Sequence, residues 1–229
     1  MLDPNPAKEL RWLDVPVSSG RESKEWSMKR VPMLDPYDII QYLWGVAGVE
    51  VPEGQLQSYW EQAISSGLPW AQNRGDPGHG EPLRIPLKLF GDDTRYSLQS
   101  DSVVAFVLSC PLWRPHQARN SRWIVGVLEE RYSLGLATWA PVLARLVWSL
   151  NQLFDVGIWA GGRNIKFEVT EIAGDWKYLR QVFALRSHWN SENVCHHCNI
   201  ARRDFPALPQ DCCVSDHCLC AMCALLECC

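Results

Sequence analysis

Two Gly-Asp pairs are the first residues in this sequence that could carry out chemistry. Asp92 follows Gly91, and Asp175 follows Gly174. A glycine before the acid lets the backbone leave a strand sharply and lets a phosphate or a metal ion approach it closely. Mg²⁺ and Mn²⁺ prefer carboxylate oxygens as protein ligands. We therefore expect Asp92 and Asp175 to form part of a catalytic metal site if their strands lie side by side.

Strand parity leaves the identity of the first acid open. Asp93, not Asp92, shares a face with Leu87 and Leu89 if the strand continues undisturbed. A bulge at Gly91 would move Asp92 to that face instead. Asp93 is therefore an alternative to Asp92. Gly-Asp is also a common turn dipeptide, and one such pair alone would indicate only a turn.

A third carboxylate is harder to find. Glu171 shares parity with Asp175 but lies four residues earlier, about 13 Å along a strand, so we expect it at the surface or in an ion pair. Cleavage with two metal ions normally uses a further acid. The later acids lie in polar or Cys-rich sequence without a helical pattern: Glu192, Asp204, Asp211, Asp216 and Glu227. We expect the metal site to be incomplete.

The cysteines suggest a second metal. Cys195 and Cys198 have the spacing at which two thiolates bind one tetrahedral Zn²⁺. Four later residues are candidate partners in a Cys₄ or Cys₃His centre: His217, Cys218, Cys220 and Cys223. However, residues 211–229 hold seven Cys in nineteen positions without regular spacing, which is more typical of sequence read past a frameshift or splice error than of a zinc module.

The first acid follows a predicted strand. Residues 85–89 alternate apolar and polar side chains up to the acidic turn at 91–93, where we expect the strand to end. Two β-rich apolar runs, 103–110 and 123–128, predict the next two strands. Three strands therefore follow one another along the chain.

A helix separates these strands from the second acid. Thr138 is the expected cap of a helix whose apolar side chains recur at helical spacing up to Phe154 and which ends near Gly157. The run 165–172 then alternates again and predicts a fourth strand. The resulting order is that of the RNase H fold, in which the first and fourth strands lie adjacent and each supplies an aspartate. We expect an α/β fold with an RNase H-like mixed sheet.

The rest of the chain supports a division into four parts. Asp35 and Pro36 suit a helix start, and 54–66 has helical spacing, whereas the first thirty residues show no sustained period. The parts are an irregular, disordered arm (1–30), a helical preface (31–72), an RNase H-like core (83–190), and a Cys-x-x-Cys knuckle with a Cys-rich tail (191–229).

Several segments together resemble a known family. They are PLKLFGDD (86–93), SRWIVGVLEE (121–130), LVWSLNQLFDVG (146–157), VTEIAGDWKYLRQVFALRSHWN (169–190) and CHHC (195–198). Over residues 31–204 the chain resembles transposase-derived proteins abundant in protist, especially dinoflagellate, genomes. It is more distantly similar to the DDE cores of the CACTA and Plavaka/Kyakuja groups. The resemblance implies Mg²⁺-dependent DNA strand transfer, with Asp92 and Asp175 as the matching acids and DNA as the partner.

The sequence also departs from that family. The third acid of the family lies on a helix well beyond the Cys-x-x-Cys pair, whereas this chain ends 31 residues after Cys198. We therefore expect a truncated, inactive DDE-type domain. The alternatives are a zinc-stabilised interaction module without enzyme activity and an expressed transposon relic.

The charge of the chain and the motifs that it lacks argue against several other classes of protein. A net charge of −4 and a pI near 5.9 argue against a dominant basic surface for nucleic acid. The sequence shows no secretory signal and no apolar run long enough to span a membrane, so we expect a nuclear or cytoplasmic protein without a membrane partner. It also lacks the G-x-S-x-G, Walker A, Rossmann and H-E-x-x-H motifs.

Overall fold

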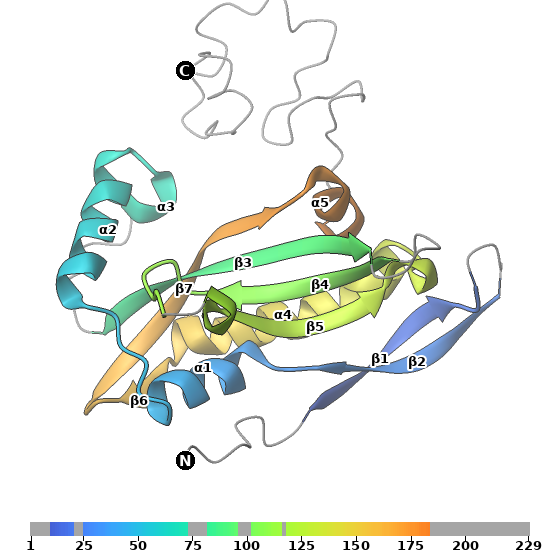
Figure 1. Cartoon of the computed structure of the whole chain (residues 1–229), viewed down its shortest axis with the longest axis horizontal. Coiled ribbons are helices and arrows are strands. Elements are labelled where there is room, and N and C mark those ends of the chain that lie inside the picture. Colours follow the sequence, from blue (N-terminus) through green and yellow to red (C-terminus); the bar gives the residue numbers. More distant parts are fainter. Residues whose placement is uncertain (1–9, 21–24, 73–81, 96–101, 116–117, 184–229) are drawn as a thin grey trace, which may run out of the picture.

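A mixed sheet of seven strands runs through the part of the chain that the computed structural model describes, residues 10–20, 25–72, 82–95, 102–115 and 118–183 (Figure 1). The strand order is β1-β2-β5-β4-β3-β7-β6. The strands are β1 (Arg11–Ser18), β2 (Trp26–Met33), β3 (Leu83–Arg95), β4 (Ser102–Ser109), β5 (Arg122–Glu129), β6 (Ile158–Ala160) and β7 (Arg163–Gly174). The helices are α1 (Pro36–Gly45), α2 (Glu53–Ser65), α3 (Pro69–Gln72), α4 (Leu136–Asp155) and α5 (Trp176–Phe183), with 3₁₀ turns η1 (Ala118–Ser121) and η2 (Glu130–Tyr132).

The strand-strand-strand-helix-strand order predicted from the sequence is confirmed. β3, β4 and β5 pair antiparallel in succession, and β7 returns after α4 to pair parallel with β3. β3 is longer than expected, because it continues through Asp92 and Asp93 to Arg95 in unbroken register with β4. The acidic turn predicted at 91–93 is therefore wrong.

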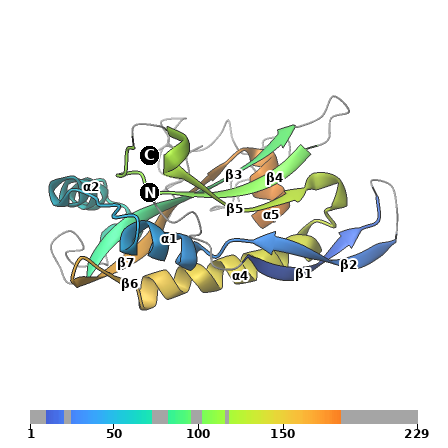
Figure 2. The same ribbon diagram turned by 60° about the horizontal axis from the view of Figure 1, so that its bottom comes forward.

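α4 covers one face of the sheet, where it contacts β1 and β7 (Figure 2). Its buried stripe includes Trp139, Val142, Leu146 and Leu153, which are three, four or seven residues apart and so lie on one side of the helix. The Trp139 ring meets Phe106 of β4 edge to face, with 5.8 Å between ring centroids. Full burial of each large apolar side chain contributes about 1.5–3 kcal/mol, so this stripe fixes α4 on the sheet.

The start of α4 differs from the prediction. Gly135, with φ at +64°, is the residue before the helix, and Thr138 lies inside the first turn. The Thr138 hydroxyl accepts the backbone N–H of Leu134 at 2.9 Å and donates to the carbonyl of Pro16 in β1 at 2.6 Å. Thr138 therefore joins the helix to an edge strand instead of capping the helix.

The irregular arm expected over 1–30 is also wrong where the structure describes it. β1 and β2 form an antiparallel hairpin, in register from Arg11 opposite Met33 to Ser18 opposite Trp26. Val15 and Val17 are buried and lie on one face of β1, whereas Asp14 is exposed. The first nine residues lie outside the described part.

The predicted helical preface is present as α1, α2 and the short α3. α2 is anchored to the central strands by two side chains: the Trp60 indole N–H donates to the carbonyl of Arg84 at 3.1 Å, and the Tyr59 hydroxyl lies 2.7 Å from that of Thr170. No helix among the described residues combines the length and apolar character needed to cross a bilayer.

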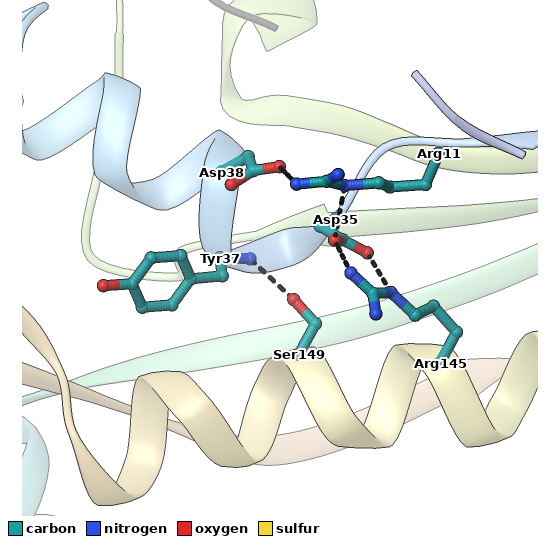
Figure 3. Close-up of polar contacts among 6 residues, drawn as sticks. All are labelled: Arg11, Asp35, Tyr37, Asp38, Arg145 and Ser149. Carbon is teal, nitrogen blue, oxygen red and sulfur yellow. Dashed lines mark hydrogen bonds and ion pairs between the residues drawn. The ribbon is translucent and has the colours of Figure 1, made fainter. Parts of the chain in front are cut away.

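An ion pair between the buried carboxylate of Asp35 and the partly exposed guanidinium of Arg145 joins the start of α1 to α4 (Figure 3). Asp35 precedes Pro36 as predicted, but its carboxylate makes no hydrogen bond to the helix end. It instead accepts both Nε and Nη2 of Arg145, the first at 2.9 Å. Arg11 of β1 reaches the same carboxylate at 3.4 Å and that of Asp38 at 3.8 Å. The hydrogen bonds that Arg145 donates to Asp35 raise the pKa of the Arg145 guanidinium, so Arg145 remains charged.

Candidate functional site

The parallel pairing of β3 with β7 places Gly91 directly opposite Gly174. The register shifts between Leu87 and Lys88: Leu87 pairs with Val169 but Lys88 pairs with Glu171, so β7 contains one extra residue, Thr170. Without that bulge Gly91 would face Ala173. The irregularity considered for Gly91 therefore occurs on the neighbouring strand.

Asp92 and Asp175 come next along the chain after these two paired glycines. Asp92 lies within β3 and is half-buried, whereas Asp175 follows the end of β7 and is exposed. Because β3 has no bulge at Gly91, Asp92 lies on the opposite face from Leu87 and Leu89. The side chain of Asp93 is outside the described part, so the choice between Asp92 and Asp93 stays a prediction.

Asp175 caps α5. One carboxylate oxygen, Oδ1, accepts the backbone N–H of Tyr178 at 2.6 Å, which satisfies one of the free donors at the start of the helix. Its other oxygen is not needed for the cap. Asp175 could therefore bind a metal ion through one oxygen while it holds α5 in place.

Tyr178 explains why glycine precedes both acids. Its fully buried ring lies across the two backbones: a Cβ built on Gly91 would be 1.8 Å from Cζ of Tyr178, and one built on Gly174 would be 2.4 Å from Cδ1. The two glycines thus allow a tyrosine ring to approach the backbone closely, where a phosphate or a metal ion was expected. Burial raises the pKa of Tyr178, and its hydroxyl has no hydrogen-bond partner among the described residues.

Glu130 is an acid near this site that the sequence did not single out. It accepts hydrogen bonds from Ser102, from Lys177 at 2.8 Å and from Gln181 at 2.7 Å, and so ties α5 to the ends of β4 and β5. Burial alone would raise the pKa of Glu130, but these hydrogen bonds outweigh it and lower the pKa to about 2. Nothing local marks Glu130, because its partners are distant in sequence.

Glu171 behaves as predicted. Its carboxylate is exposed and lies 2.5 Å from the ammonium group of Lys88, the residue opposite it on β3. It is therefore a paired surface residue.

The described residues contain no group of three or more His, Cys, Asp or Glu side chains placed to hold a metal ion. The zinc candidates Cys195, Cys198, His217, Cys218, Cys220 and Cys223 all lie outside the described part. Within it, Cys110 is a buried free thiol whose pKa burial raises to about 11, so it is a core residue.

Comparison with known proteins adds no family. No protein-family model matches the chain, and no curated protein matches its sequence significantly.

Proposed function

We propose that this chain carries an RNase H-like, DDE-type domain derived from a transposase, with an incomplete metal site that does not cleave DNA. The observation that supports this most is the parallel β3–β7 pair, which aligns Gly91 with Gly174, so that Asp92 and Asp175 each follow one of two paired positions on adjacent strands. In the RNase H fold the first and fourth strands are adjacent and deliver the two acids in this way.

The rest of the sheet is consistent with the proposal. The central order β5-β4-β3-β7 corresponds to third, second, first and fourth strands, with α4 as the crossover before the fourth. The β1–β2 hairpin and the short β6 are additions at the two edges. The resemblance of the sequence to transposase-derived proteins points in the same direction and suggests DNA as the partner.

The chemistry of two carboxylates limits the activity. Two ions about 3.5–4 Å apart are needed to activate the attacking group and to stabilise the leaving oxygen. Asp92 and one oxygen of Asp175 suffice for one Mg²⁺ or Mn²⁺ that keeps several waters. We therefore expect weak binding of one ion, with a Kd of about 1 mM, and no strand cleavage.

Binding of Mn²⁺, followed by electron paramagnetic resonance of the free ion, tests the site. Asp92→Asn and Asp175→Asn should each weaken binding by about tenfold or more, because a neutral amide is a poorer ligand for a hard cation. Asparagine also caps helices well, so Asp175→Asn should leave α5 folded. Glu171→Gln is the matched control, since it removes an exposed acid of β7 and should leave Mn²⁺ binding unchanged.

A plasmid-nicking assay with Mg²⁺ or Mn²⁺ tests the missing activity. We expect no nicking by the wild-type chain. Nicking that disappears in Asp175→Asn would contradict the incomplete site but support the DDE-type fold. Equal Mn²⁺ binding in the wild type and both aspartate variants would contradict a shared site. If that result came with stoichiometric bound zinc, a zinc-stabilised interaction module would replace the proposal.

A further inference from the structure

The sheet is split between β2 and β5. β1 pairs with β2 along its whole length, but β2 meets β5 at one position only, Met33 opposite Gly126. Beyond that point the β1–β2 hairpin diverges from β5 (Figure 1). Each of the two strands therefore has an edge that no other described strand pairs with.

A groove of about 540 Å³ lies in this split. Its lining includes Val17 and Val31 from the hairpin and Leu128 and Tyr132 from β5 and η2. One residue of a strand within a sheet occupies about 4.8 Å × 10 Å × 3.3 Å, or about 160 Å³. The groove therefore has room for about three residues of an extended chain.

The backbone on both sides of the groove can hydrogen-bond such a chain. The Leu34 N–H donates to the carbonyl of Val125 at 2.7 Å. Leu34, directly after β2, and Val125 on β5 therefore direct these backbone groups toward the opposite strand. Backbone groups alternate between the two edges of a strand. Met28 and Arg30 on β2 thus direct N–H and C=O groups toward the groove without a partner strand, and Glu129 on β5 directs its N–H there, because its C=O begins the η2 turn.

The charges in the groove favour an acidic occupant. Glu129 is paired with Arg131, with 2.6 Å between Oε2 and Nε. Lys29, on the opposite wall, is exposed and has no ion pair with any described residue. The unpaired charge in the groove is therefore positive.

We propose that the split between β2 and β5 is a binding site for an extended peptide segment with an acidic side chain, which adds to the sheet as an extra strand between them. Its backbone bonds to the edges at Met28, Arg30 and Glu129, and its carboxylate pairs with Lys29. Main-chain pairing of this kind supplies affinity, while side-chain pockets supply specificity. The site is independent of the two aspartates and of the function proposed for them.

The test uses fluorescein-labelled pentapeptides and the full chain. The probe has the sequence Thr-Val-Asp-Val-Thr, a second peptide has lysine in place of the aspartate, and a third carries N-methyl groups on alternate amides. Fluorescence anisotropy should show the aspartate peptide binding about tenfold more tightly than the lysine peptide. The N-methylated peptide should bind about tenfold more weakly, because it has lost donors to the strand edges.

Two variants and amide exchange locate the site. Lys29→Glu should reverse the preference between the two charged peptides. Arg122→Glu makes the same charge change at an exposed position of β5 outside the groove and should preserve the preference. Hydrogen exchange should show the amides of Met28, Arg30 and Glu129 slowed by peptide.

The proposal is overturned by absence of binding at about 1 mM of the aspartate peptide, or by binding that Lys29→Glu does not alter. It is also overturned if sedimentation shows a dimer whose groove amides are protected without peptide, because a second copy would then be the occupant.

Discussion

Replacing Gly91 by alanine should push the Tyr178 ring off the paired glycines. The new Cβ would lie 1.8 Å from Cζ of Tyr178, far inside van der Waals contact. The ring cannot turn aside freely, because it is fully buried and packs against Phe106 and Phe183. Overpacking of this kind costs about 1–3 kcal/mol, so Gly91→Ala should lower the free energy of unfolding by about that amount.

A double-mutant cycle isolates the contact. Tyr178→Ala alone should cost about 3–5 kcal/mol, as for other large aromatic side chains removed from cores. With the ring gone, the methyl group added by Gly91→Ala enters the space that the ring left, so this substitution should cost little in that background. The coupling free energy should exceed about 1 kcal/mol.

Urea unfolding followed by tryptophan fluorescence measures the free energies of unfolding of the wild type, the two single variants and the double variant. Trimethylamine N-oxide at fixed concentration keeps the less stable variants folded. Gly54→Ala in α2 is the control, because nothing lies within 4 Å of its added Cβ and alanine stabilises helices by up to about 1 kcal/mol relative to glycine. If the losses in the two single variants sum to the loss in the double variant within about 0.5 kcal/mol, contact with Tyr178 is not the reason for a glycine at position 91.

Two further predictions concern acids that bind the elements together. Asp35→Asn should lower the free energy of unfolding by about 1.5–3 kcal/mol, because the buried carboxylate accepts charge-assisted hydrogen bonds from the partly exposed Arg145. Asp38→Asn, whose pair with Arg11 is exposed, should cost less than about 1 kcal/mol. Equal urea midpoints for the two variants would contradict this. The folded-state pKa of Glu130, about 2, lies below its ordinary value of 4.5, so its stabilisation is complete above pH 4.5 and is lost as the pH falls toward 2. Urea midpoints should therefore fall more steeply over that range in the wild type than in Glu130→Gln, and parallel curves would refute the assignment.

Local periodicity explains which elements could be predicted from the sequence. The period of two at 85–89 and 165–172 and the helical spacing from Trp139 to Leu153 arise from burial on one face, and burial on one face is a local property. The presence of these elements was therefore predicted correctly, whereas the end of β3 and the start of α4 were not. Glu171 was placed in an ion pair or at the surface because it lies about 13 Å along the strand from Asp175.

The β1–β2 hairpin was missed because of its prolines. Pro16 lacks a backbone N–H and argues against a strand, although prolines occur in edge strands such as β1, where one side of the backbone faces no partner. The alternation of Leu13, Val15 and Val17 is a clear signal once the prolines are discounted.

The contacts around the candidate site could not be predicted, because each joins residues that are far apart in sequence. The ring of Tyr178 reaches Gly91 only because the Thr170 bulge sets the register of β7. Glu130 gains its partners from α5, about fifty residues later. Only the packed chain brings such groups together.

The attachment of the hairpin and α1 to α4 has a consequence for biosynthesis. The hydrogen bonds between Thr138 and Pro16, between Arg145 and Asp35 and between Tyr37 and Ser149 span 122, 110 and 112 residues. A ribosome releases the first member of each pair long before the second, so the N-terminal third must wait, with its apolar side uncovered, until the long helix has emerged. Nascent chains halted before residue 136 should therefore depend on chaperones, and those halted well beyond residue 183 should not.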